Sequence, residues 1–167
     1  MCELCNIFSK SCNNHTLNHS YFTLRTPQLK IISTTAKLKK ILLIEDNCNI
    51  LENLAEYLEL EGYQVISTGN GIRGVELARE LLPDLIICDM PKPGIDGYEV
   101  LRLILSTADT YEIPFIFCST LAEAINRLDA LELGADNYIV KPFELEAVLQ
   151  MVKDCITTGS KRLKFSM

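Results

Sequence analysis

The sequence contains no apolar run near the length of about 20 residues that a membrane-spanning helix needs. Its longest apolar strings, such as residues 41–44, have the length of a buried strand. The first 25 residues show no apolar core followed by a small-residue cleavage site, so we expect no secretory signal. Apolar residues make up 48% of the 167 positions, which excludes a disordered chain and indicates one domain with tails. These features predict a cytoplasmic protein without membrane association.

The sequence also lacks a disulfide framework. It contains seven cysteines, an odd number, and their spacings match no known disulfide-stabilised domain. Cys88 and Cys118 end apolar strings, where a free thiol packs as a small hydrophobic side chain. We therefore expect reduced cysteines in a buried core.

A group of potential zinc ligands lies near the N-terminus. Its members are Cys2, Cys5, Cys12, His15 and His19. Zinc prefers cysteine and histidine ligands, but these spacings match no standard zinc finger, and no small apolar core accompanies them. We interpret the segment as a solvated arm, with a zinc site as the alternative.

Basic and acidic residues are segregated along the chain. Residues 1–40 carry six basic residues and one acidic residue, and residues 158–167 carry three basic residues. Residues 41–157 carry seven basic and 21 acidic residues, a net charge of −14. We divide the chain into a poorly ordered arm (1–39), a central domain (40–157) and a basic tail (158–167). Because nucleic-acid phosphates are bound by Lys and Arg, we expect no direct nucleic-acid binding by this acidic domain.

The central domain alternates short apolar runs with amphipathic stretches. The runs cover residues 41–44, 63–67, 85–88, 115–118 and 138–140. Between them, apolar residues recur every three or four positions, which predicts helices that include residues 100–108, 121–131 and 145–156. Apolar strands joined by helices are typical of a parallel sheet covered on both faces. The sequence therefore predicts an α/β fold of five βα units in three layers.

Reactive polar residues follow four of the predicted strands. They are Glu45 and Asp46, then Asp89, then Ser119 and Thr120, and finally Lys141. Because the carboxyl ends of parallel strands meet at one edge of a sheet, we expect these side chains to converge. An all-oxygen set of carboxylates suits a hard cation such as Mg2+. A cation, an amine and a hydroxyl around one carboxylate match the needs of phosphoryl transfer to that carboxylate.

Several of these residues also have an ordinary structural explanation. Asp46 or Asn47 would cap a helix that begins before Ile50. Lys141-Pro142 would form a turn. Their joint occurrence at strand ends, in this order, favours a site over separate structural roles.

Four segments resemble the receiver domain of bacterial two-component response regulators. They are LLIEDN (42–47), PDLIICDMPKPGIDGYEVL (83–101), IPFIFCSTL (113–121) and LGADNYIVKPF (133–143). The resemblance spans residues 40–157 and implies a flavodoxin-like (βα)5 fold with strand order 2-1-3-4-5. It implies a phosphoacceptor signalling domain, not an enzyme that converts a separate substrate. The phosphoryl donor would be a sensor histidine kinase or a phosphotransfer protein.

The resemblance also implies a role for each site residue. Asp89 would be the phosphoacceptor, and Lys141 and Ser119 would contact the phosphoryl group. The Mg2+ ligands would be Asp46 directly, Glu45 through water, Asp89 and the backbone carbonyl of Pro91. Tyr138 would be the switch aromatic, and Thr120 the small residue beside the site.

Three local features follow from the same resemblance. Lys141-Pro142 would be a cis peptide bond, which X-Pro bonds permit at low cost. Asp96-Gly97 would form the turn into the third helix. Gly134 would end the fourth helix, where a glycine relieves the strain of a left-handed residue.

Two positions beside the site differ from the common family pattern. Pro91 stands two residues after the acceptor and Leu121 two residues after Ser119, and neither offers a polar side chain. In this family these positions influence how a hydrolytic water is held. We therefore predict slow self-dephosphorylation.

The end of the chain favours output through a protein partner. Met151 stands where many DNA-binding members carry an arginine used in dimer salt bridges, and about ten residues follow the fifth predicted helix. We expect a stand-alone regulator that contacts an unknown downstream protein or acts by competing for phosphate. The contact surface would be the face formed by the fourth helix, the last strand and the fifth helix.

Two alternative functions stay open. Gly69, Gly71 and Gly74 spell G-x-G-x-x-G between a predicted strand and helix, as in Rossmann-like dinucleotide-binding enzymes. That interpretation leaves the residues at the strand ends unexplained, and it needs a phosphate-binding turn beside an edge strand. The other alternative is an interaction module with the receiver fold that is not phosphorylated.

Overall fold

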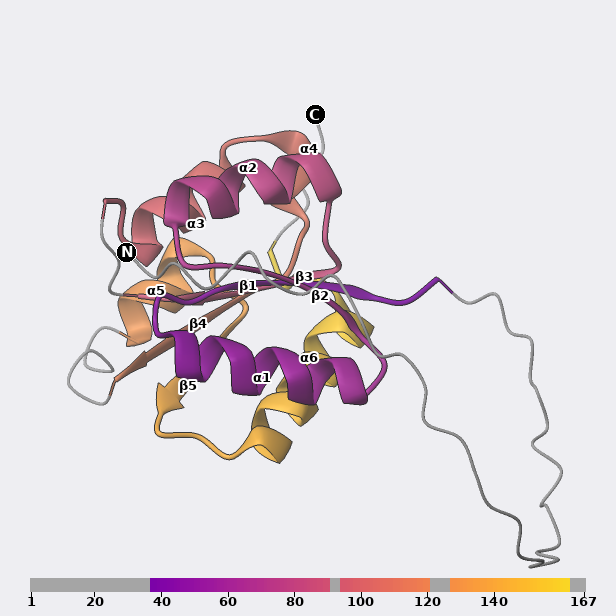
Figure 1. The fold of residues 1–167 in the computed structure, drawn as a ribbon. Helices are drawn as coiled ribbons and strands as arrows, with labels where there is room; N and C mark the ends of the chain where they lie inside the picture. Colours follow the sequence, from indigo (N-terminus) through magenta and orange to yellow (C-terminus); the bar gives the residue numbers. More distant parts are fainter. Residues whose placement is uncertain (1–36, 91–93, 121–126, 163–167) are drawn as a thin grey trace, which may run out of the picture. The chain divides into compact units, whose positions relative to one another are not determined.

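Five parallel strands form the centre of the computed structural model, which describes residues 37–90, 94–120 and 127–162. The chain divides into two units, residues 1–35 and 36–167, and all described elements belong to the second. Strands alternate with helices along the chain (Figure 1). The elements are β1 Lys40–Ile44, α1 Cys48–Leu60, β2 Gln64–Thr68, α2 Gly71–Leu81, β3 Leu85–Asp89, α3 Gly97–Leu105, α4 Ala108–Tyr111, β4 Phe115–Thr120, α5 Arg127–Leu133, β5 Asn137–Lys141 and α6 Leu145–Thr158.

The strand order is β2-β1-β3-β4-β5, with every neighbouring pair parallel. This order confirms the predicted flavodoxin-like topology. The chain leaves β1 toward β2 on one side and later returns to β3 on the other, so the order switches at β1 and β3. Ile44 at the end of β1 pairs with Cys88, and Asp89 pairs with Cys118. The residues that follow β1, β3, β4 and β5 therefore meet at one edge of the sheet.

Two apolar clusters, one on each face of the sheet, form the core. Successive side chains of each strand point to opposite faces of the pleated sheet, so they contribute alternately to the two clusters. Figure 1 shows α1 and α6 below the sheet and α2 and α3 above it. The cluster below includes Ile41, Leu43, Leu54, Leu58, Ile87, Ile116 and Val152. The cluster above includes Leu42, Ile44, Val75, Ile86, Val100, Phe117 and Ala130, which places α5 in the upper layer.

The predicted helix over residues 100–108 is interrupted, and its prediction as one continuous helix was wrong. Helix α3 ends at Leu105, and the short α4 begins at Ala108. The Ser106 hydroxyl donates to the carbonyl of Leu103, and the buried Thr110 hydroxyl donates to that of Ile104 at 2.6 Å. These hydroxyls take the carbonyls that a continuing helix would use. The fourth predicted helix is therefore α5, and the fifth is α6.

The predicted turns have the expected local geometry. The Asp96 carboxylate caps α3 by accepting a hydrogen bond from the Glu99 amide at 2.8 Å. Gly134 follows α5 with φ of 115°, a conformation that favours glycine. Lys141-Pro142 is a cis peptide bond. Each feature shapes a loop next to the strands.

The residues after α6 fold back onto the domain through Asp136, which is 6% exposed. Its carboxylate accepts hydrogen bonds from the Ser160 hydroxyl, the Lys161 amide and the Arg162 guanidinium. It also accepts one from the Phe115 amide at the start of β4. The described part of the basic tail is therefore attached to the edge of the sheet opposite the predicted site.

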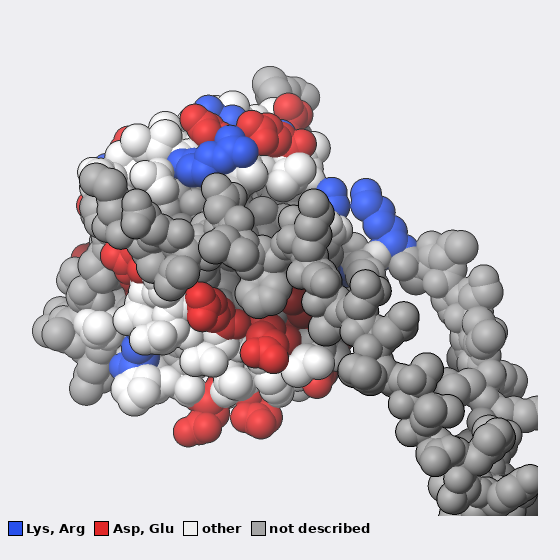
Figure 2. Space-filling view, in the orientation of Figure 1, with Lys and Arg blue, Asp and Glu red and all other residues white. Residues whose placement is uncertain are grey.

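The surface reflects the acidic composition of the central segment. Figure 2 shows acidic side chains over both helical layers, with basic ones interspersed mainly above the sheet. Arg73 on α2, for example, pairs with Glu76 and Glu80. Within the described residues, no helix combines the length and apolar character needed to cross a membrane.

Candidate functional site

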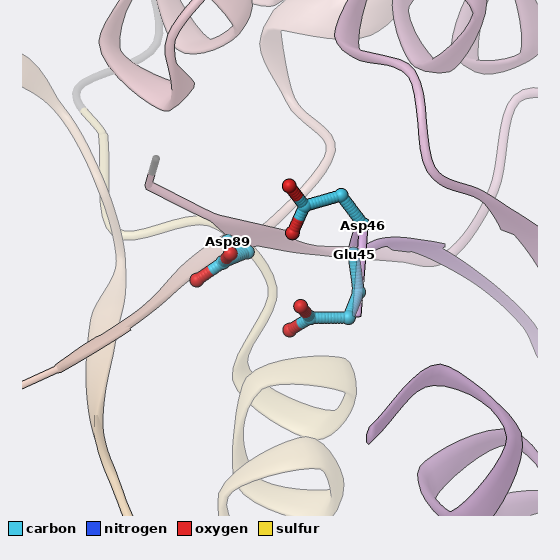
Figure 3. Close-up of side chains that lie close together, drawn as sticks. All are labelled: Glu45, Asp46 and Asp89. Carbon is cyan, nitrogen blue, oxygen red and sulfur yellow. The ribbon is translucent and has the colours of Figure 1, made fainter. Parts of the chain in front are cut away.

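Three carboxylates converge at the carboxyl edge of the sheet, as predicted. Glu45 and Asp46 follow β1, and Asp89 ends β3. In Figure 3 the side chains of Glu45 and Asp46 extend toward Asp89, and one carboxylate oxygen of each of the three residues lies within 4.8 Å of the others. Glu45 and Asp89 are only 3% and 4% exposed, whereas Asp46 is exposed. The cluster therefore has two buried members and one on the solvent side.

Lys141, the last residue of β5, supplies a positive charge to this cluster. Its ammonium donates to Glu45 Oε2 at 2.6 Å and to Asp89 Oδ1 at 2.9 Å. Burial lowers the pKa of Lys141, but the hydrogen bonds to Glu45 and Asp89 outweigh burial, and the pKa stands above its ordinary value. The residue is thus a charged ammonium that links two carboxylates whose mutual repulsion would otherwise be uncompensated.

The local backbone explains why Asp46 faces the cluster. Asn47 is the N-cap of α1, and its side-chain oxygen accepts hydrogen bonds from the amides of Asn49 and Ile50. The Asn47 amide in turn donates to Glu45 Oε1 at 3.1 Å. Of the two predicted capping candidates, Asn47 therefore takes the structural role. Asp46 stays directed toward Glu45 and Asp89.

Buried hydroxyls adjoin the carboxylates on the side of β4 and β5. Ser119 and Tyr138 are 0% and 4% exposed, and a short hydrogen bond joins their oxygens. The Ser119 hydroxyl also lies 3.2 Å from the carbonyl of Thr120, and the Tyr138 hydroxyl lies 3.5 Å from Met90 Sδ. Tyr138 thus points inward, next to the predicted acceptor strand.

Met90 is a site residue that the sequence analysis missed. Its only signal in the sequence is its position directly after Asp89. The side chain is 7% exposed and belongs to the same apolar cluster as Tyr138. Thr120, by contrast, was predicted as the small residue beside the site. It is exposed, and together with Lys141 it lines an apolar groove.

The donor atoms fit a hard divalent cation. The cluster offers carboxylate oxygens from three residues and no sulfur or imidazole within the described part of the chain. Mg2+ takes few protein carboxylates and keeps several waters, which matches a cluster with one exposed member. Cys88 and Cys118 are buried in β3 and β4, as predicted for core residues, and neither forms a disulfide.

The glycines of the competing G-x-G-x-x-G motif have packing roles. A Cβ on Gly71 would lie 2.9 Å from Ile95, and one on Gly74 would lie 2.4 Å from Ile44. Their absent side chains let α2 approach β1 and the start of α3. The motif also adjoins β2, which is the edge strand and lies outside the β1–β3 switch point.

Some predicted residues lie outside the described part of the chain. They are the magnesium ligand Pro91, Leu121, and the zinc candidates Cys2, Cys5, Cys12, His15 and His19. The predictions that rest on them stay predictions.

The fold and site together define a class of protein. It is a doubly wound α/β domain with an acidic cluster, one lysine and buried hydroxyls at the carboxyl edge of its sheet. Residues 41–153 match the family model described as the response regulator receiver domain. The chain belongs to this family, which confirms the resemblance identified from the four motifs.

The curated relatives are transcriptional regulators by name. The chain is 37% identical over 127 residues to "Probable transcriptional regulator ycf27" of Porphyra purpurea, with 72% of this chain and 51% of the relative covered. It is 34% identical over 114 residues to "DNA-binding dual master transcriptional regulator RpaA" of Synechocystis sp., with 68% and 47% covered. The chain spans about half the length of these relatives. The expectations of a stand-alone regulator and of no nucleic-acid binding therefore remain predictions.

A similar solved structure carries a metal. It is the receiver domain of a sensor histidine kinase from Pseudomonas aeruginosa, described with a magnesium ion coordinated in the active site cleft. The TM-score is 0.67 at 28% sequence identity, with 72% of this chain and 99% of that chain covered.

Proposed function

We propose that this chain is a phosphoacceptor in a two-component phosphorelay and that Asp89 receives the phosphoryl group. The observation that carries the proposal is the contact of one ammonium, Lys141, with both Asp89 and Glu45 at the carboxyl edge of the sheet. A carboxylate next to a fixed cation is suited to attack phosphorus, because the cation offsets the charge on the transferring group. The donor is a phosphohistidine of a sensor kinase or of a phosphotransfer protein.

The transfer exchanges one bond to phosphorus for another. An oxygen of Asp89 forms the new O–P bond while the N–P bond of the phosphohistidine breaks. The electron pair of the broken bond stays on the imidazole, which takes up a proton. Lys141 contacts the phosphoryl oxygens, and the Ser119 hydroxyl donates a hydrogen bond to one of them.

Magnesium would be held by Asp46 directly, by Asp89, by the carbonyl of Pro91 and by Glu45 through water. When bound, it offsets negative charge that develops on the phosphoryl oxygens. The three carboxylates and the one lysine leave the described site with net negative charge, which favours a divalent cation. A similar receiver domain with magnesium coordinated in its active site cleft supports the choice of ion.

A donor protein needs a surface beside Asp89. An apolar groove of about 740 Å3 opens between α1 and the start of α6, next to Lys141 and Thr120. Tyr57 and Leu60 of α1 and Phe143 line it, and Leu60 is 79% exposed. The groove supports docking of a protein donor beside Lys141. Because the described cysteines form no disulfides, the proposed location is the reducing cytoplasm.

Phosphorylation would act on the face formed by α5, β5 and α6, which the sequence analysis predicted as the output surface. Tyr138 on β5 already contacts Ser119, so a bond from Ser119 to the phosphoryl group reaches this face directly. A shift between two packings of this face would then select the downstream protein. Slow self-dephosphorylation is part of the proposal.

The test is uptake of phosphate from acetyl phosphate with Mg2+, followed by intact mass spectrometry. We expect one hydroxylamine-labile phosphoryl group on the wild-type chain and none on Asp89→Asn. The matched control is Asp96→Asn, an exposed cap of α3 where asparagine is an equally good cap. Uptake by Asp89→Asn, or no uptake by the wild-type chain, would contradict the proposal. The second result would favour an interaction module that is not phosphorylated.

A further inference from the structure

We propose that Met90 is a positioning residue that opposes phosphoryl binding by holding the hydroxyl proton of Tyr138. The inference rests on the proposed function, because it concerns how Ser119 becomes available to a phosphoryl group on Asp89. It is carried by the contact of the Tyr138 hydroxyl with Met90 Sδ at 3.5 Å.

Ser119 and Tyr138 have fewer protons than hydrogen-bond contacts. Each hydroxyl carries one proton, yet the two take part in three contacts: with each other, with the Thr120 carbonyl and with the Met90 sulfur. Because their two oxygens are in short contact, one proton must lie between them, which leaves two arrangements that each satisfy two contacts. In the first, Ser119 donates to Thr120 and Tyr138 donates to Ser119. In the second, the Met90 arrangement, Tyr138 donates to the sulfur and Ser119 donates to Tyr138.

The two arrangements differ in their readiness for a phosphoryl group. A phosphoryl oxygen needs the Ser119 proton, and Ser119 can then accept the proton of Tyr138. The first arrangement already has the bond from Tyr138 to Ser119 in this direction, so only the Ser119 proton turns. In the Met90 arrangement both protons must turn, and the contact with the sulfur is lost. Met90 therefore stabilises the unphosphorylated state selectively.

The surroundings of Met90 hold its backbone in place and enclose its side chain. Its amide donates to the Cys118 carbonyl at 3.0 Å, and its own carbonyl accepts from the Gly97 amide at 2.9 Å. A Cβ on Gly97 would lie 3.1 Å from the Met90 Cα, so the start of α3 packs closely against this residue. With 7% of its surface exposed, the side chain cannot turn into solvent without opening the core. The acceptor is thus preorganised toward Tyr138.

The test replaces Met90 by leucine, which conserves volume but offers no acceptor. The probe is beryllofluoride with Mg2+, a phosphoryl mimic, measured by isothermal titration calorimetry. We expect Met90→Leu to bind beryllofluoride about threefold more tightly, which corresponds to ~0.6 kcal/mol, the lower end of the hydrogen-bond range, because a thioether is a weak acceptor and the Thr120 carbonyl stays available to Ser119. In a Tyr138→Phe background, where no hydroxyl is present, Met90→Leu should change the affinity less than twofold. Met151→Leu, at a half-buried methionine of α6, is the matched control and should leave it unchanged.

Equal or weaker binding by Met90→Leu, or a gain of the same size in the Tyr138→Phe background, would overturn the role of Met90. Urea unfolding checks that Met90→Leu folds, and Met90→Ile gives the same comparison if it does not. Failure of the wild-type chain to bind beryllofluoride and to take up phosphate would instead refute the proposed function.

Discussion

Replacing Lys141 by methionine tests how strongly the ammonium stabilises the buried carboxylates. The substitution keeps an apolar stem of similar length and removes two charge-assisted hydrogen bonds, of 2.6 Å to Glu45 and 2.9 Å to Asp89. Removal of one partner from a buried ion pair costs about 3–5 kcal/mol, because the other partner is left buried without compensation. The exposed Asp46 opens one side of this cluster to water, so we expect the lower end, ~3 kcal/mol.

The assay is urea and thermal unfolding at pH 7.5 without divalent cations. A loss of ~3 kcal/mol corresponds to a decrease in Tm of roughly 10 °C for a domain of this size. Lys153→Met is the matched control, because Lys153 pairs with Glu61 at 3.7 Å while both side chains are well exposed. Exposed pairs contribute about 0–1 kcal/mol, so the control should lose little. Added Mg2+ should reduce the deficit of Lys141→Met, since a cation that binds the folded carboxylates stabilises the fold.

The result that would refute this reasoning is a Lys141→Met variant no less stable than Lys153→Met. Lys141 would then not compensate the charge of Glu45 and Asp89. The contact that carries the proposed function would lose its energetic basis.

Three further outcomes follow from the structure. Asp136→Asn should lose ~3 kcal/mol of unfolding free energy, because it leaves the 8% exposed Arg162 without its counter-charge; an unchanged urea midpoint would contradict this. Gly74→Ala should lower the free energy of unfolding by about 1–3 kcal/mol, because the added methyl group overlaps the Ile44 side chain. A Gly74→Ala variant as stable as the wild type would contradict this and would show that α2 can move away from Ile44. Folding raises the pKa of Lys141, because its ammonium donates hydrogen bonds to Glu45 and Asp89. The contribution of these bonds to the free energy of unfolding is therefore complete below the unfolded pKa of about 10.4, and it is lost as pH rises through the folded pKa. Unfolding free energy of the wild type should therefore fall above pH ~10 more steeply than that of Lys141→Met.

Much of the fold could be predicted from the sequence because its signals are local. Continuous apolar runs such as residues 41–44 and 85–88 have the length and composition of strands buried on both faces. The break between α3 and α4 was not predictable from periodicity, since Ala108 continues the apolar stripe of α3. The helix stops where the Ser106 and Thr110 hydroxyls donate to the carbonyls of Leu103 and Ile104, and the structure is needed to see these contacts.

The candidate site was predicted from strand ends because topology alone brings those ends together. This argument placed Lys141 near Glu45, although the two are 96 residues apart in the chain. It could not identify Met90 as a partner of Tyr138, because that contact depends on side-chain packing beneath the site. The contact between Asp136 and Arg162 was likewise beyond prediction, since neither residue belongs to a periodic pattern.

The most direct test of the central claim is a crystal structure of the chain grown with Mn2+, which substitutes for Mg2+ and scatters anomalously. If Glu45, Asp46 and Asp89 form one cation site beside Lys141, a single anomalous peak should lie between the carboxylates of Asp46 and Asp89. An absent peak at saturating Mn2+, or a peak elsewhere with these carboxylates directed apart, would contradict the claim.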